Sequence, residues 1–175
     1  NRGVLTIATE IDPRTQDAAQ QAVSNYVYPT DPVIAVMVMI EPGTGLIKGI
    51  AQSRPEIGTN EGQTYYNYAM DASRGGAEGY FGGSTFKAFT LAAALEKGFP
   101  TSRSYNAPNS MDFNGQVFSS CEGRFRAKGW KSPVTTGTSG YYDMYEGAKK
   151  SSNTYFMQLE RDTGLCEVTR MAEKL

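Results

Sequence analysis

Histidine is absent from this chain of 175 residues. Its absence removes the imidazole that serves as general base in most serine hydrolases, and it removes the commonest nitrogen ligand of a zinc site. The two cysteines, Cys121 and Cys166, are too far apart in sequence to form a closely spaced metal-binding pair. We therefore expect neither a metal nor a cofactor. The two cysteines could form a disulfide or remain two separate thiols, and the sequence leaves both open.

An excess of one charge and a long apolar run are also missing. The 17 basic and 18 acidic residues leave a net charge of -1, which disfavours nucleic-acid binding. No apolar run approaches the roughly 20 residues of a membrane helix, and the N-terminus resembles neither an initiator methionine nor a signal peptide. With 39% hydrophobic residues the chain can bury a core. We expect an excised piece of one domain, with any anchor or export signal upstream.

A serine and a lysine open a long apolar segment. Lys87 follows Ser84 by three positions, so on a helix the two side chains share a face. The apolar run after Lys87 extends to about Leu95, and Gly98 is typical of a helix end. Many ordinary helices carry serine and lysine at this spacing. A lysine inside an apolar helix, however, is costly unless it is neutral or paired, which favours Lys87 as the base that activates Ser84.

A second polar group, Ser151-Ser152-Asn153, precedes another helical stretch. Alone it is best interpreted as a helix N-cap. Together with a buried serine and lysine, it supplies a second hydroxyl and an amide. Acyl transfer needs such groups to pass a proton to the leaving amine and to hold the substrate's amide. Lys149 and Lys150, just before it, could be solvated charges.

The remaining patterns predict a mixed fold. Asp12 and Pro13 begin a helix that ends near Tyr28. The apolar run 33–40 predicts a central strand covered on both faces, and residues 46–51 a second strand that completes an antiparallel hairpin. Residues 52–83 have little periodicity and predict a long irregular connection. A short strand is expected at 116–118.

The chain resembles, over nearly all of its length, the transpeptidase domain of high-molecular-weight penicillin-binding proteins, with class A expected. Ser84-Thr-Phe-Lys87 is similar to the family's Ser-Xaa-Xaa-Lys motif, and Ser151-Ser152-Asn153 to its Ser-Xaa-Asn motif. Segments 9–19 and 38–45 look like those that lead into this domain. The resemblance implies an α/β fold of the β-lactamase-like type, with an antiparallel sheet flanked by helices and an all-helical region. Residues 1–175 would be a partial transpeptidase domain, incomplete at the C-terminus.

The resemblance also implies a function. Ser84 would be the acylated nucleophile and Lys87 its proton acceptor; Ser151 would pass the proton on, and Asn153 would hold Lys87 and the substrate amide. The reaction is the cross-linking of peptidoglycan stem peptides at D-Ala-D-Ala, on the outer face of the bacterial cytoplasmic membrane. β-Lactam antibiotics would acylate the same serine. The full-length protein would be membrane-anchored.

Two departures from the family pattern stand out. Gly82 and Gly83 occupy the positions of the usual proline and glycine before the nucleophile, and the Lys-Thr-Gly motif does not occur. We therefore expect these 175 residues alone to be inactive, since that motif supplies part of the substrate site.

Three alternatives differ in the second motif or in the use of the site. Class D β-lactamases share Ser-Thr-Phe-Lys but carry an apolar residue where this chain has Asn153. Class A β-lactamases carry aspartate where it has Ser152. A non-catalytic sensor of β-lactams or muropeptides would keep both motifs.

Overall fold

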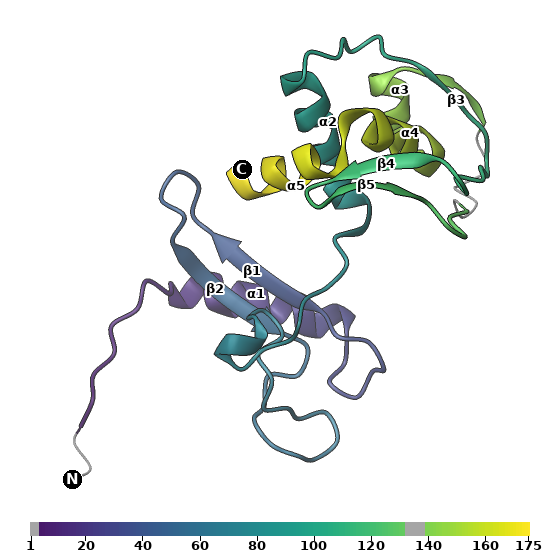
Figure 1. Ribbon diagram of the computed structural model, residues 1–175. Coiled ribbons are helices and arrows are strands. Elements are labelled where there is room, and N and C mark those ends of the chain that lie inside the picture. Colours follow the sequence, from purple (N-terminus) through teal and green to yellow (C-terminus); the bar gives the residue numbers. More distant parts are fainter. Residues whose placement is uncertain (1–3, 132–138) are drawn as a thin grey trace. The chain divides into compact units, whose positions relative to one another are not determined.

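The computed structural model describes residues 4–131 and 139–175 and divides them into two compact units (Figure 1). The first unit is Asn1–Phe81 and the second is Gly82–Leu175. Each has a hydrophobic core of its own. Within the described ranges, no helix has both the length and the apolar character needed to cross a bilayer.

The first unit packs one helix against a hairpin. Helix α1, Pro13–Tyr26, begins at Asp12, whose carboxylate accepts hydrogen bonds from two backbone N–H groups of the first turn. Strands β1, Val36–Ile40, and β2, Ile47–Gln52, pair antiparallel, which confirms the predicted hairpin. Its core consists of Ala19, Val23 and Ala51. The predicted helix start at Asp12 and Pro13 is thus confirmed.

Glutamine side chains fasten α1 to β2. The Gln16 amide donates to Ile50 O at 2.7 Å and accepts from Ile50 N at 2.8 Å, so it pairs with the strand backbone as another strand would. Gln20 donates to Gln52 O at 3.0 Å. Gly49 permits this close approach, because a Cβ there would lie 3.3 Å from the Gln16 Cα. These three backbone groups of β2 are thereby hydrogen-bonded to side chains of α1.

The prediction that β1 is covered on both faces is wrong for this structure. In the described part of the chain β1 pairs with β2 alone, and α1 covers one side of the hairpin. Val38 and Ile40 are 40% and 58% exposed. The continuous apolar run indicates that both faces of β1 are apolar. It could not show whether another element covers the second face. The connection that follows β2 is irregular as predicted, apart from the short helix η1, Ala72–Arg74.

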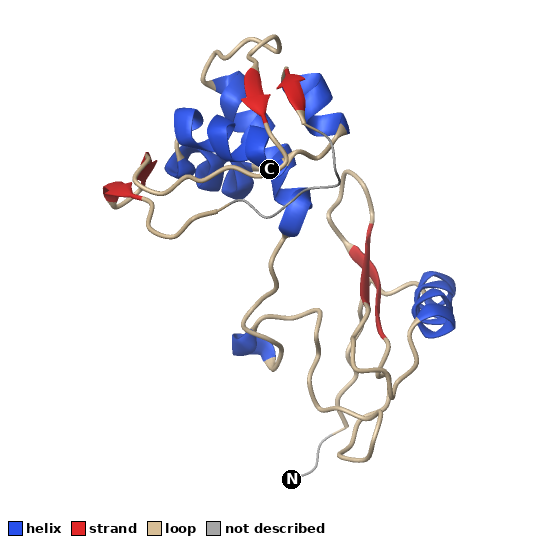
Figure 2. Ribbon diagram, turned by 90° about the vertical axis from the view of Figure 1, so that its right-hand side faces the viewer, coloured by secondary structure: helices blue, strands red, loops and turns tan. Residues whose placement is uncertain are grey.

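The second unit is mainly helical (Figure 2). Helix η2, Gly83–Phe86, is a 3₁₀ turn that continues directly into α2, Lys87–Glu96. The later helices are α3, Met144–Lys149, α4, Asn153–Thr163, and α5, Leu165–Lys174. Within its described residues, the strands form two antiparallel pairs: β3, Tyr105–Ala107, with β6, Gly140–Tyr142, and β4, Val117–Ser120, with β5, Gly123–Arg126. The strand expected at 116–118 overlaps β4, which begins one residue later, and Gly98 follows the end of α2 with a φ of 88° as predicted.

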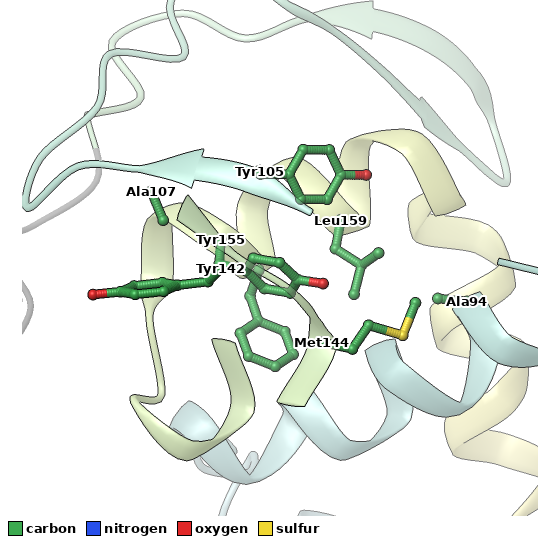
Figure 3. Close-up of a cluster of buried hydrophobic side chains, with 8 residues drawn as sticks. Ala94, Tyr105, Ala107, Tyr142, Met144, Tyr155 and Leu159 are labelled. Carbon is green, nitrogen blue, oxygen red and sulfur yellow. The ribbon is translucent and has the colours of Figure 1, made fainter. Parts of the chain in front are cut away.

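Tyr155 lies in the largest buried cluster of this unit (Figure 3). Its ring is fully buried, packs edge-on against Tyr105 at 5.4 Å between centroids, and its hydroxyl donates to Arg103 O at 2.9 Å. Burial raises the pKa of Tyr155 well above its ordinary value. The cluster contains Ala94, Tyr105, Ala107, Tyr142, Met144, Tyr155, Phe156 and Leu159. It joins α2, α3 and α4, and so fixes the helices that carry both predicted motifs.

A disulfide joins Cys121 to Cys166. Cys121 lies in the turn between β4 and β5, and Cys166 is the second residue of α5. Of the two possibilities that the sequence left open, the structure thus contains the disulfide. It attaches the β4–β5 hairpin to the helical part of the unit.

Candidate active site

Lys87, the first residue of α2, directs its amine toward the second motif. Its Nζ donates to Ser151 O at 2.6 Å, to Ser151 Oγ at 3.0 Å and to Asn153 Oδ1 at 2.7 Å. An ammonium group has three N–H donors, so these acceptors satisfy it completely. The Phe156 ring lies 5.2 Å from Nζ and closes the apolar side of the site. Two segments more than 60 positions apart in sequence therefore meet at one amine.

The second motif is shaped by the junction of α3 and α4. Ser151 has a φ of 47°, in the left-handed region that non-glycine residues rarely adopt. This conformation places both its carbonyl and its hydroxyl oxygen on Lys87. Ser152 is the N-cap of α4, because its hydroxyl accepts from Tyr155 N. The N-cap interpretation is thus confirmed for Ser152, while Ser151 and Asn153 on either side contact the lysine.

Ser84 lies one turn before Lys87, in η2. It is exposed, and its carbonyl oxygen accepts from Lys87 N. Gly83 precedes it with a φ of 54°, so this position of the entry turn requires glycine. Across residues 4–131 and 139–175, no hydrogen bond joins the Ser84 hydroxyl to Lys87 Nζ. The structure therefore brings Lys87, Ser151 and Asn153 together, whereas Ser84 is linked to the lysine through the backbone alone.

Burial lowers the pKa of the Lys87 amine from its ordinary value, while the negative charge of Glu160 acts in the opposite direction. The balance favours loss of the proton compared with a lysine in water. The sequence required a lysine in an apolar helix to be neutral or paired, and the structure gives Lys87 three oxygen partners.

Glu160 is a residue of the site that sequence reasoning missed. It lies on the same face of α4 as Asn153, two turns further along the helix. Both residues line a pocket of about 220 Å³ together with Lys87. Its Oε1 accepts from the Thr90 hydroxyl at 2.8 Å. Burial raises the pKa of the Glu160 carboxyl, against the hydrogen bond from Thr90 and the charge of Lys87. The spacing of seven from Asn153, two helical turns, was the available signal.

Comparison with known proteins agrees with this geometry. The family model described as the penicillin binding protein transpeptidase domain matches residues 35–175. "Penicillin-binding protein 1A" of Mycolicibacterium smegmatis is 29% identical over 171 residues, which are 96% of this chain and 18% of that protein. "Penicillin-binding protein 1A" of Mycobacterium tuberculosis is 34% identical over 98 residues, which are 54% of this chain and 10% of that protein. The chain thus spans less than a fifth of the curated relatives that it matches.

Solved structures show the same likeness. Penicillin-binding protein A from M. tuberculosis, determined as its penicillin G acyl-enzyme complex, has a TM-score of 0.69 and 26% identity, over 94% of this chain and 39% of that one. The penicillin-binding protein PonA1 from Mycobacterium tuberculosis has a TM-score of 0.63 and 25% identity, over 97% of this chain and 38% of that one. The predicted α/β fold with antiparallel strands is confirmed by these neighbours.

Proposed function

The chain belongs to the transpeptidase family of penicillin-binding proteins, and from this premise we propose that it is part of a class A peptidoglycan DD-transpeptidase that uses Ser84 as its nucleophile. The substrate is a peptidoglycan stem peptide that ends in D-Ala-D-Ala. A β-lactam mimics that terminus and acylates the same serine. An acyl-enzyme with penicillin G in a solved relative supports this part of the proposal.

In the proposed reaction each of the four polar side chains has its own role. Ser84 Oγ attacks the carbonyl carbon of the penultimate D-alanine while the neutral Lys87 amine accepts its proton. The proton then passes through the Ser151 hydroxyl to the leaving nitrogen, and D-alanine departs as the C–N bond breaks. The amine of a second stem peptide attacks the ester and forms the cross-link, while Lys87 takes a proton from that amine and returns it to Ser84 Oγ as the ester C–O bond breaks. Asn153 keeps the Lys87 amine in place and binds the substrate's amide.

The observation that carries the proposal is the meeting of Lys87 with Ser151 and Asn153. A neutral lysine amine has two N–H donors and one lone pair. It can therefore donate to only two of the three neighbouring oxygens. The two N–H groups can remain on Ser151 O and Asn153 Oδ1. The third position of the amine, where an N–H of the ammonium form meets the Ser151 hydroxyl at 3.0 Å, then becomes the lone pair that accepts the Ser84 proton and returns it to that hydroxyl.

The setting of the domain is part of the proposal. Residues 1–175 would form part of a transpeptidase domain in a membrane-anchored protein, on the outer face of the bacterial cytoplasmic membrane. Family membership supports this setting, because stem peptides are assembled into the wall at that face.

Intact-mass spectrometry of the full protein that carries this chain tests the proposal. Benzylpenicillin should add one penicilloyl group to the wild type and none to Ser84→Ala, while Ser102→Ala, which changes an exposed serine of the same unit, should label normally. Labelling that survives in Ser84→Ala would refute the assignment of the nucleophile.

The lifetime of the adduct separates the alternative functions. A penicilloyl group that persists for many minutes, together with cross-linking of stem peptides, supports the transpeptidase. Hydrolysis within seconds would indicate a β-lactamase instead. A stable adduct without any cross-linking would indicate a sensor.

A further inference from the structure

Two helix faces meet at the pocket beside Lys87. From η2 and α2 come Gly83, Phe86 and Lys87, and Thr90 follows one turn later on α2. From α4 come Asn153, Phe156, Met157 and Glu160. Positions three, four and seven apart share a face of a helix, so these two sets are facing stripes. Both stripes are apolar except for the lysine, the asparagine, the threonine and the glutamate.

Glu160 lines this pocket and is partly buried. The Thr90 hydroxyl, which is fully buried, donates to Glu160 Oε1 at 2.8 Å. Among the residues that the structure describes, no cation lies within ion-pair distance of this carboxyl. Partial burial without a direct cationic partner is unfavourable for a carboxylate, because desolvation disfavours its charged form.

The other charged groups near α4 are engaged elsewhere. On α4 itself, Arg161 donates to Asp162, whose carboxylate also binds Arg103 from the segment before β3. From the end of α2, Lys97 donates to the carbonyl oxygens of Asp162 and Thr163.

The neighbouring helices contribute no further charge to the pocket. On α5, charged side chains line a separate hollow between α2 and α5. On α3, Lys149 pairs with Glu146. In the described part of the chain, Lys87 and Glu160 are thus the two charged groups that line the pocket, one on each wall.

We propose that Glu160 is a positioning residue of the Lys87 site: held by Thr90, its carboxylate sets the pH range in which the Lys87 amine is free to accept a proton. The inference rests on the proposed role of Lys87 as the base of acylation. It adds a control on that base that neither of the two sequence motifs contains.

The sign of the effect follows from Coulomb's law. A carboxylate across a partly buried pocket stabilises the ammonium form of Lys87 and thereby keeps it protonated to higher pH. Burial acts in the opposite direction and lowers the pKa of the amine. Both effects contribute to the pH at which the amine loses its proton. Removing the carboxylate takes away the negative charge that opposes the effect of burial. The amine should then lose its proton at lower pH, and acylation should become faster on the acidic side of its pH profile.

Competitive labelling measures the Lys87 titration directly. The full protein is treated with a trace of acetic anhydride at a series of pH values, and acetylation of the peptide that contains Lys87 is quantified by mass spectrometry. Only the neutral amine reacts, so the midpoint of the labelling curve reports the titration without any acylation of Ser84. In Glu160→Gln the midpoint should move to lower pH. In Glu160→Asp, which keeps the charge, it should stay near that of the wild type.

Three controls make the result decisive. Glu160→Leu replaces a buried carboxyl by an apolar group, should give the same downward shift, and carries the test if Glu160→Gln does not fold. Glu173→Gln makes the same chemical change at an exposed site of α5 and should leave the midpoint unchanged. Thermal unfolding followed by circular dichroism establishes that each variant is folded.

The pH profile of penicillin acylation is the second readout. We expect its acidic limb to move to lower pH in Glu160→Gln, with a severalfold faster rate below the wild-type midpoint. An unchanged labelling midpoint in both Glu160→Gln and Glu160→Leu would overturn the proposal, whatever the rate of acylation. A shifted midpoint in a protein that penicillin never acylates would uphold the link between Glu160 and Lys87 and would instead refute the proposed function.

Discussion

Lys87 Nζ lies 2.7 Å from Asn153 Oδ1, although 66 positions separate the two residues in the sequence. The amide oxygen accepts one N–H of the amine and so fixes where the amine points. Hydrogen bonds to a charged group contribute about 1.5–3 kcal/mol. We predict that Asn153→Ala slows penicillin acylation of the full protein by about 10- to 100-fold, measured with a fluorescent penicillin. Asn60→Ala, in an exposed loop of the first unit, should acylate at the wild-type rate.

Two substitutions of Ser151 distinguish the effect of its backbone strain from the role of its hydroxyl. At a φ of 47° a side chain costs about 1 kcal/mol that glycine avoids. Ser151→Gly should therefore unfold in urea with a free energy about 1 kcal/mol higher than Ser151→Ala. Both variants lack the hydroxyl and should lose acylation to a similar extent. Full activity in Ser151→Gly would show that only the backbone conformation matters.

Gly147 packs directly against the Tyr155 ring. A Cβ at this position of α3 would lie 2.5 Å from Tyr155 Cδ1 and 2.7 Å from Cγ. The ring is fully buried and cannot move aside. Gly147→Ala should lower the free energy of unfolding by about 1–3 kcal/mol. As the matched control, Gly82→Ala has φ of -64° and ordinary contacts, so its stability should equal or slightly exceed that of the wild type.

The disulfide should contribute measurably to stability. It closes a loop between residues 45 positions apart, which restricts the unfolded chain. Replacing both Cys121 and Cys166 by serine should lower the free energy of unfolding by about 2–4 kcal/mol. Reductant should destabilise the wild type by a similar amount and leave the double variant unaffected. Intact mass with and without reductant gives the disulfide content, and two free thiols in protein from an oxidising compartment would contradict the structure.

Asp162 should make the second unit sensitive to acid. Burial tends to raise the pKa of its carboxyl, but hydrogen bonds from Tyr105, Arg103 and Arg161 outweigh burial and lower it overall. The folded state therefore holds the proton less tightly than the unfolded chain. The resulting stabilisation is present above the ordinary carboxyl pKa of about 3.9 and is lost as the pH falls through the lowered folded value.

Removal of this charge tests that dependence. Asp162→Asn should unfold more easily at neutral pH, by about 1–3 kcal/mol, and its stability should vary less below about pH 4. Glu122→Gln, in the exposed turn of the β4–β5 hairpin, should keep the acid dependence of the wild type. Equal acid sensitivity in Asp162→Asn and wild type would assign the effect to other carboxyls.

Features with a local signal could be predicted from the sequence. Asp12 followed by Pro13 marks the start of α1, and turn residues between two apolar runs mark the hairpin of β1 and β2. The burial of Lys87 followed from the apolar residues around it on α2. In each case the residues that decide the structure are neighbours in the sequence.

Features that depend on distant segments could not be predicted in this way. The exposure of Val38 depends on which element covers β1, and the packing of Gly147 depends on Tyr155 from another helix. Sequence reasoning did not place Glu160 beside the lysine, and its bond to Thr90 comes from another helix. The role of Ser84 as nucleophile stays a prediction, because its hydroxyl makes no hydrogen bond to the Lys87 amine within the described ranges.

Ser152 starts helix α4, while the residues on either side of it hold the Lys87 amine. Folding and reactivity therefore draw on the same three consecutive positions. Under the proposed function, a substitution there that slowed the reaction with a β-lactam would also weaken the helix or remove the hydrogen-bond partners of the lysine. We expect resistance to evolve through the pocket walls around this tripeptide and to leave the tripeptide itself intact.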